Sequence, residues 1–256
     1  MSGLSEPRQL LDDICLNIVF FTRLRLPSSD FGGRSLADAI WAAPFAGLAV
    51  AVIGALAYAI AAQLGVAPGP ASALALAATM LATGCLHEDG LSDIADGFGG
   101  GRTREKKLEI MRDSRIGAYG ATALGISLLI RWSALSELTN SGEVFLALLA
   151  AHAASRGLFG AFMHLLPPAR ADGLSANAGS VSAETAVIGA ALGAAVALLA
   201  LGPGGAIAAL ILLGLLFAAL RALCLSQIGG QTGDTIGALQ QLGEIAVLLV
   251  ASVCLS

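Results

Sequence analysis

The chain alternates between long apolar runs and short polar connections. Seven runs are candidates for crossing a hydrocarbon layer, which is ~30 Å thick and takes ~20 helical residues to span. They cover residues 36–63, 71–86, 117–135, 144–166, 185–201, 206–227 and 236 to the C-terminus. Because these runs of Ala, Leu and Gly lack the alternation of a barrel strand, they are expected to be helices. The pattern predicts an all-α fold: one polytopic membrane bundle of about seven transmembrane helices over residues 1–256.

Composition agrees with an integral membrane protein. Apolar residues make up 56% of the chain and charged residues 12%, which is about half the charged share of soluble domains. The net charge of −4 says little about partners, because the charge is local. The first strongly apolar run begins only near Leu36, so no signal peptide is expected. The four cysteines have no metal-ligand spacing and are expected to face the core.

The lysines and arginines predict the topology. Bases precede the first run, separate the second from the third and follow the fourth, whereas the connections VAPGPAS, SELTNSGE and GPGG contain none. The positive-inside rule then places the N-terminus, the connection at 87–116 and the connections before the fifth and seventh runs in the cytoplasm. Eleven of the fourteen bases obey this assignment. The sequence thus predicts a multi-pass membrane protein with its N-terminus in the cytoplasm.

One apolar segment is too short and too charged to span. It is LLDDICLNIVFFTRLRLP, residues 10–27, in which Leu, Ile, Val and Phe stand beside acids and arginines. The mixture predicts an interfacial helix or a re-entrant lid. The alternative is a helix packed on the bundle with no chemical role.

Charge is concentrated between Leu86 and Gly120, a stretch with seven of the eighteen acids and six of the fourteen bases. At about 100° per residue, Asp89, Asp93 and Asp96 share one narrow helix face. Like charges at this spacing repel, so the pattern needs a compensating cation. Oxygen ligands without thiols suit Mg²⁺ or Mn²⁺. The acids therefore predict a metal site, and the alternative is a solvated acidic face.

Groups suited to phosphate follow the acids. In GFGGGR the glycines let backbone N–H groups approach an anion and Arg102 can pair with its oxygens, although such stretches also serve as hinges. TREKKLEIMRDSRIG is predicted to form an amphipathic helix. Arg112, Asp113 and Arg115 then precede the third run. Arginine matches phosphate geometry, and a carboxylate between two arginines can be held ionised as a metal ligand or a base.

A second polar cluster, GGQTGDT at 229–235, is expected on the same side of the membrane. Its glycines, glutamine and threonine resemble another phosphate or metal loop, with Asp234 as a ligand or, alternatively, as the N-cap of the last helix. Glu244, deeper in the last run, is a functional candidate because intramembrane carboxylates are costly. Arg131, Arg156 and Arg221 are explained equally well by pairing between helices and by substrate contact, and His152 and His164 are expected to be packing residues.

Four segments carry a family resemblance. HEDGLSDIADGF, EIMRDSRIGAYG, GGQTGD and FFTRLRLP, in their order along a chain of this length, resemble the cobalamin synthase family, adenosylcobinamide-GDP ribazoletransferase. The resemblance implies that adenosylcobinamide-GDP reacts with α-ribazole, or its 5′-phosphate, to give adenosylcobalamin, or its 5′-phosphate, and GMP, with Mg²⁺ required. It also implies that the ribazole 3′-hydroxyl attacks the phosphorus attached to cobinamide.

On this interpretation the residues receive roles. The acidic face and the last connection would hold the cation through Asp89, Asp93, Asp96 and Asp234. The catalytic set would comprise Arg112 and Arg115 on phosphate, Asp113 as base or further ligand, and Glu88 as supporting residue or alternative base. Substrate would also contact Arg102, Gly230, Gln231 and Thr232. Spacing does not decide which carboxylate is the base, because geometry must come before pKa.

Two other functions fit parts of the pattern. A CDP-alcohol phosphotransferase is also a multi-span Mg²⁺ enzyme, but LSDIAD after Asp89-Gly90 lacks its Ala-Arg and brings the acids too early. A cation or metabolite transporter would place its site near the bilayer midplane, whereas the densest charge here lies in a connection. The spacing of Gly189 and Gly193 permits close helix contacts within one protomer or between protomers of a homo-oligomer.

Overall fold

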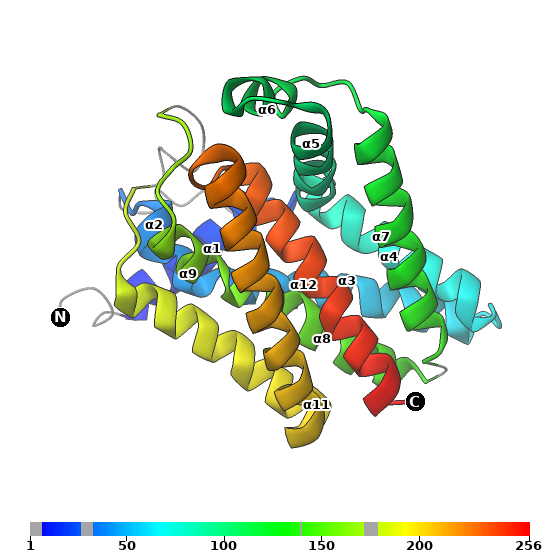
Figure 1. Ribbon diagram of the computed structural model, residues 1–256. Coiled ribbons are helices and arrows are strands. Elements are labelled where there is room, and N and C mark those ends of the chain that lie inside the picture. Colours follow the sequence, from blue (N-terminus) through cyan, green and yellow to red (C-terminus); the bar gives the residue numbers. More distant parts are fainter. Residues whose placement is uncertain (1–6, 27–32, 139, 172–178) are drawn as a thin grey trace.

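The computed structural model describes residues 7–26, 33–138, 140–171 and 179–256. Within these ranges the chain is helical, apart from loops and one isolated bridge that pairs Pro168 with Gln231 (Figure 1). The helices are α1 (Pro7–Phe21), α2 (Leu36–Ala39), η1 (Ile40–Ala42), α3 (Ala43–Gln63), α4 (Pro68–Thr83), α5 (Leu86–Gly100), α6 (Arg104–Ile110), α7 (Ala118–Ser136), α8 (Ser141–Gly157), α9 (Phe159–Leu165), α11 (Ala183–Ile228) and α12 (Gly233–Cys254). The predicted all-α class is confirmed.

The number of spans differs from the seven that the sequence predicted. Five helices of the described residues are long and apolar enough to cross a membrane, and α4 with α5 makes a sixth if this bent pair is one span. The difference is one of counting, because α11 is taken as one helix although its 46 residues cover both the fifth and the sixth expected run and bend sharply between them. Gly202 has a left-handed φ of 69° and Pro203 follows it, so α11 folds into two limbs that form a V (Figure 1). The protein is a polytopic membrane bundle.

A sharp elbow separates α4 from α5. The second run was expected to continue to residue 86, but α4 ends at Thr83 because Gly84 and Cys85 both take left-handed conformations, with φ of 65° and 59°. The two helices meet at 89°. Residues 87–116, expected as a connection, are therefore largely helical and form α5 and α6. The elbow lays α5 across the end of the bundle.

Helix α1 packs on the bundle and is held there by buried polar contacts. It ends at Phe21, short of the expected boundary at residue 27, which lies outside the described residues. The buried Asp13 carboxylate accepts two hydrogen bonds from the Arg34 guanidinium, at 2.8 and 2.7 Å, and one from Trp41 Nε1 at 2.8 Å. Asn17 donates to the Ala39 carbonyl at 2.7 Å. The α1 helix is thereby fixed against α2 and η1.

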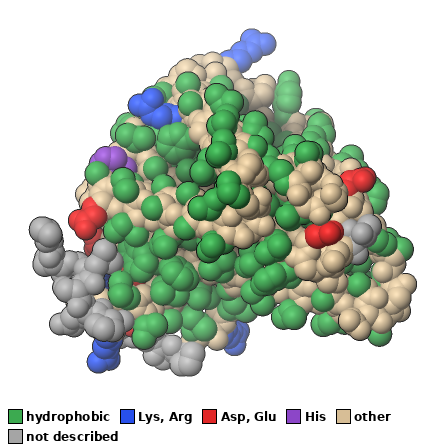
Figure 2. Space-filling model, turned by 90° about the horizontal axis from the view of Figure 1, so that it is seen from below, with side chains coloured by type: hydrophobic (Ala, Val, Ile, Leu, Met, Phe, Trp, Pro, Cys, Tyr) green, Lys and Arg blue, Asp and Glu red, His purple; other side chains and the backbone are tan. Residues whose placement is uncertain are grey.

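The middle of the bundle is built from small residues. The span formed by α8 and α9 and the span formed by α12 are each 72% buried, whereas that of α11 is 22% buried. Gly189 and Gly193 pack inside the same chain, where a Cβ would lie 3.4 Å from the Gly157 carbonyl oxygen and 3.1 Å from the Ala153 carbonyl oxygen, respectively. The small-residue spacing therefore serves contacts within the protomer. On the outside of α11, Leu199 and Leu215 are exposed, and Figure 2 shows a face dominated by hydrophobic side chains.

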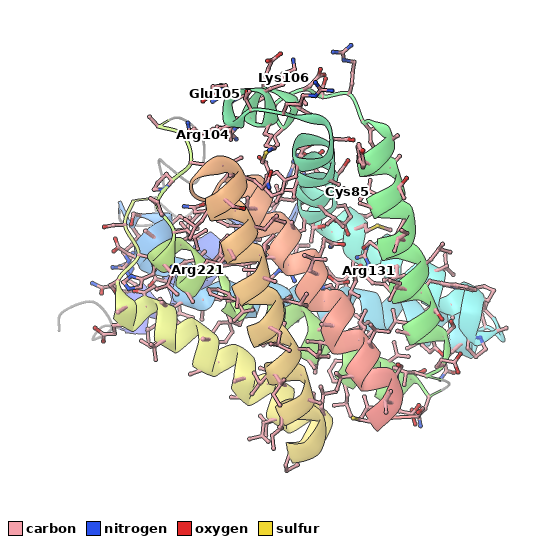
Figure 3. The ribbon with its side chains drawn as sticks, in the orientation of Figure 1. Cys85, Arg104, Glu105, Lys106, Arg131 and Arg221 are labelled. Atoms are coloured by element: carbon pink, nitrogen blue, oxygen red, sulfur yellow. The ribbon has the colours of Figure 1, made fainter. Side chains whose placement is uncertain are left out.

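The two polar motifs lie at one end of the molecule. In Figure 1, α5, α6, the end of α11 and the start of α12 gather at the top, and the Gly202 bend and the C-terminus lie at the bottom. The charged side chains of Glu105 and Lys106 on α6 project from this top end in Figure 3. Segments more than 100 residues apart in the sequence thus form one polar end of the bundle.

Candidate active site

Helices α5 and α12 cross at a pair of glycines. A Cβ built on Gly90 would lie 2.7 Å from the Asp234 carbonyl oxygen and 3.2 Å from the Gly237 Cα. A Cβ on Gly237 would lie 3.3 Å from the His87 Cα. Glycine, which has no Cβ, is needed at both positions for the two backbones to come this close. The crossing sets the first turn of α12 directly against the acidic face of α5.

The crossing brings carboxylates from both helices together. The predicted shared face of Asp89, Asp93 and Asp96 is confirmed by the single helix α5. Asp93 lies within electrostatic reach of Asp89, Asp96 and Asp234, and one cation, Arg170, acts against them. Arg170 Nη2 is 3.6 Å from Asp234 Oδ2, and the Thr232 hydroxyl donates to the same oxygen at 3.1 Å. The site therefore gathers more negative than positive charge.

The carboxylates are of two kinds. Both oxygens of Asp96 are engaged: one accepts from the Gly117 N–H at 2.7 Å and the other from the Gly120 N–H at 2.9 Å. This places Asp96 as a cap on the first turn of α7, where a negative charge also meets the positive end of the helix dipole. Asp89 is exposed and Asp93 half-buried. Asp89 and Asp93 face the open side of the site, and Asp96 ties α5 to α7.

The donor set suits a hard divalent cation. No group of three His, Cys, Asp or Glu side chains in the described part of the chain is close enough to hold a metal ion by itself. Mg²⁺ commonly uses one or two carboxylates and takes its other ligands from water and substrate phosphates. The clustered, incompletely neutralised carboxylates of α5 and α12 fit that mode of binding.

The Arg-Asp-x-Arg segment lies in the turn between α6 and α7. Arg115 Nη2 and Asp113 Oδ2 are 2.5 Å apart, and 87% of the Arg115 side chain is exposed. Hydrogen bonds from Arg115 lower the pKa of Asp113 to about 2. Asp113 is therefore ionised and a weak base in this arrangement, and it pairs with Arg115 instead of joining Asp89 and Asp93. Arg102 and Arg112 are exposed in the turns on either side of α6.

The GGQTGD segment is a tightly bonded turn. The Gln231 N–H donates to the Pro167 carbonyl at 2.8 Å, and the Gln231 carbonyl accepts from the Ala169 N–H at 2.8 Å. A Cβ on Gly230 would collide with the Pro167 carbonyl oxygen. Thr232, and not Asp234 as the alternative prediction had it, is the N-cap of α12. The segment holds Asp234 in the first turn of that helix.

The comparison with known proteins decides the family. The sequence pattern of cobalamin-5-phosphate synthase matches residues 13–252. The chain belongs to this family. It is 73% identical over 251 residues to the adenosylcobinamide-GDP ribazoletransferase of Mesorhizobium japonicum, with 98% of this chain and 96% of the relative covered. The enzyme of the same name from Bradyrhizobium diazoefficiens is 53% identical over the same shares. No solved structure matches the chain.

Membership of the cobalamin-5-phosphate synthase family confirms the resemblance seen in the four motifs. It sets aside the CDP-alcohol phosphotransferase and transporter alternatives. The match spans both the acidic helix α5 and the GGQTGD turn, which the fold brings together.

Behind the acidic face, this family member has a buried ion-paired network. Arg131 Nη1 lies 3.1 Å from Glu88 Oε1 on α5 and 3.1 Å from Glu244 Oε1 on α12 (Figure 3). Gln240 donates to Glu244 at 2.6 Å, and His152 Nδ1 lies 3.4 Å from Glu244 Oε2. His152, expected to be a packing residue, is thus part of the network, and Glu88 is fixed by Arg131. The network pins α5, α7, α8 and α12 to one another.

Residues of the network line a small cavity of about 10 Å³, about the room that one water molecule needs. Four polar atoms of its lining residues have no hydrogen-bond partner among the described residues, namely His87 Nε2, Glu88 Oε2, His152 Nε2 and Arg156 Nε. Buried polar groups are normally satisfied by protein or ordered water. The cavity therefore has both the room and the partners for an internal water.

Sequence reasoning missed Arg104. Its Nε donates to the Ile228 carbonyl at 2.8 Å, and its Nη2 donates to the Ala169 carbonyl. The arginine thus clamps α6 onto the end of α11 and onto the segment that pairs with Gln231. In the sequence it is one of several bases on an amphipathic helix, and its partners lie 124 and 65 residues away. No local signal distinguishes it from its neighbours.

Proposed function

We propose that this chain is an adenosylcobinamide-GDP ribazoletransferase that carries out the transfer at the α5–α12 crossing. The observation that supports this most directly is the meeting of Asp89, Asp93 and Asp234 at the Gly90–Gly237 contact, in a chain of the cobalamin-5-phosphate synthase family. Phosphoryl transfer needs mainly positioning and cations that neutralise phosphate oxygens. An acidic cluster that can bind a cation, with Arg170 beside Asp234, would supply both.

In the proposed reaction the 3′-hydroxyl of α-ribazole, or of its 5′-phosphate, attacks the phosphorus that carries cobinamide. A new P–O bond forms, the bond to the GMP oxygen breaks, and GMP leaves with the electron pair. The hydroxyl proton passes to a base. The product is adenosylcobalamin or its 5′-phosphate.

The chain's residues receive their roles from their positions. One or two of the carboxylates of Asp89, Asp93 and Asp234 would hold Mg²⁺, or Mn²⁺, together with phosphate oxygens of the substrate, whose negative charge the ion would neutralise when bound. Asp96 would orient α5 through its cap on α7 and serve as a ligand only through its remaining lone pairs. Glu88, fixed by Arg131, would support the register of α5.

The remaining site residues would act on the substrates or position the site. Arg102, Arg112 and Arg115 border α6 and would grip phosphate. Asp113 would orient Arg115, because its low pKa makes it a weak base. Gly230, Gln231 and Thr232 would hold Asp234 in place by the turn they form with Pro167.

The proposed orientation puts the α5–α12 crossing, the N-terminus and the catalytic segment 87–116 on the cytoplasmic side of the bacterial inner membrane. It is supported by the positive-inside count and by the gathering of the polar motifs at one end (Figure 1). Single cysteines at two exposed positions, Ala67 in VAPGPAS and Gly233 in GGQTGD, should react with an impermeant thiol reagent from opposite sides of sealed membranes, in a variant whose exposed Cys85 and Cys254 are replaced by Ser. Labelling of both from the same side would refute this topology.

The test of the activity is product formation. Purified protein in lipid nanodiscs, given adenosylcobinamide-GDP, α-ribazole and Mg²⁺, should yield cobalamin and GMP in equal amounts. Omitting α-ribazole is the control, and it should yield no cobalamin. Absence of product from protein that circular dichroism shows to be folded would overturn the proposal.

A further inference from the structure

An apolar cavity of about 110 Å³ opens beside the acidic cluster. Its walls come from helices far apart in the sequence: Phe20 and Phe21 of α1, Ile40 of η1, Met163 of α9 and Ile236 of α12. Asp89 and Asp234 also line it. The cavity is therefore continuous with the carboxylates of the proposed active site, and α1 forms one of its walls.

The wall nearest to α5 is aromatic. The His87 ring stacks on Phe21, with ring centroids 6.1 Å apart and planes inclined by 21°, and it lies 6.0 Å from the Phe159 centroid. Phe20 meets Phe21 edge to face at 4.9 Å. Aromatic side chains favour stacked and edge-to-face contacts with further rings. The lining thus suits a flat aromatic ligand.

We propose that this cavity holds the aromatic base of α-ribazole during the transfer. The inference rests on the proposed function. A ribazole whose 3′-hydroxyl stands at the Asp89 and Asp234 carboxylates carries its base only one ribose ring away, and the apolar cavity is the space that these two carboxylates line.

The other groups of the two substrates fit the cavity less well. Guanine presents several donors and acceptors on its edge, and burying them against Phe20, Ile40, Met163 and Ile236 would leave them unsatisfied. The corrin ring is far larger than the space and bears polar amides. A methylated benzimidazole is flat and largely apolar, so it can lie against these apolar side chains while leaving far fewer polar groups unsatisfied than guanine would.

The proposal makes Met163 a residue that determines base specificity. Enlarging this side chain, which lines the cavity from α9, should shrink the cavity without altering Asp89 or Asp234. In Met163→Phe the KM for α-ribazole should rise about 10-fold or more, the usual effect of one methylene in an apolar pocket. The KM for adenosylcobinamide-GDP should stay within about twofold.

A size comparison separates a pocket effect from a fold effect. The riboside of unsubstituted benzimidazole lacks the two methyl groups, so Met163→Phe should shift the kcat/KM preference toward this smaller substrate. Met80→Phe is the matched control: Met80 is partly buried on α4, outside the cavity, and its variant should keep the wild-type preference.

The outcomes are distinct. A raised KM for α-ribazole together with a shifted size preference supports the proposal. An unchanged preference, with kcat/KM falling equally for both ribosides, overturns it, and so does a rise confined to the KM for adenosylcobinamide-GDP, which would assign the cavity to the corrinoid. Failure of the wild-type protein to form any cobalamin would instead refute the proposed function itself.

Discussion

Replacing Gly90 by Ala should separate the acidic face of α5 from Asp234. A Cβ at this position would stand 2.7 Å from the Asp234 carbonyl oxygen and 3.1 Å from its Cα, whereas ordinary contact begins at 3.4 Å. The obstacle is backbone, so α12 and α5 must part by about 0.7 Å. Overpacking of this kind lowers the free energy of unfolding by about 1–3 kcal/mol. The better helix propensity of Ala offsets about 1 kcal/mol of this loss.

The effect on catalysis should exceed the effect on stability. Misplacement of reacting groups by about 1 Å can cost about 100-fold in rate, so Gly90→Ala should lose between about 10-fold and 100-fold in kcat. The assay is the initial rate of cobalamin formation in nanodiscs, measured together with the thermal midpoint by circular dichroism.

Gly125→Ala provides the matched control. Gly125 lies within α7, and a methyl group added there would meet nothing within 4 Å, so its variant should keep the wild-type rate. A Gly90→Ala protein with the rate of Gly125→Ala would refute the reasoning, because it would show that the close crossing does not position the carboxylates.

Three further variants test other parts of the account. Arg131→Gln leaves Glu88 and Glu244 buried without their cation. This variant should lower the free energy of unfolding by about 3–5 kcal/mol, which a lower thermal midpoint would show. The control Arg115→Gln, at the surface, should keep the wild-type thermal midpoint. Asp96→Ala removes the cap of α7 and should cost about 0.5–2 kcal/mol. Pairing with Arg115 sets the pKa of Asp113 at about 2, below its usual 3.8, so the stability it contributes is complete above pH 3.8 and is lost as pH falls through about 2. The difference in thermal midpoint between wild type and Asp113→Asn should therefore be constant from about pH 5 to 8, and a difference that changes in this range would contradict the assigned ion pair.

Local patterns of the sequence were sufficient for the all-α class and for the acidic face, but not for the elbow at Gly84 and Cys85. The spacing of Asp89, Asp93 and Asp96 is a property of one helix, and GPGG marks the bend of α11 at Gly202. The same local rules located Asp234 only approximately, because a helix boundary inferred from sequence is uncertain by a few residues and the cap is Thr232.

Contacts between distant segments could not be read from the sequence. Arg131 donates hydrogen bonds to Glu88 and Glu244, which lie 43 and 113 residues away in the sequence. The sequence of any single helix does not identify these partners. The phosphate contact of the GGQTGD glycines stays a prediction, and the sequence did not indicate that Gly230 also admits the Pro167 carbonyl or that Gln231 is buried. Glycine permits both a phosphate contact and a close backbone approach, and the segment of the same chain that packs beside it determines which of them the fold uses.

The central claim is that the carboxylates at the α5–α12 crossing carry the transfer, and Asp89→Asn tests it most directly. The variant keeps the size of the side chain but removes the charge that would bind the cation. Cobalamin formation at saturating Mg²⁺ should be abolished in Asp89→Asn with its membrane insertion and thermal midpoint intact, whereas Glu105→Gln on the exposed face of α6 should retain the wild-type rate. An Asp89→Asn protein that forms cobalamin at the wild-type rate would contradict the account.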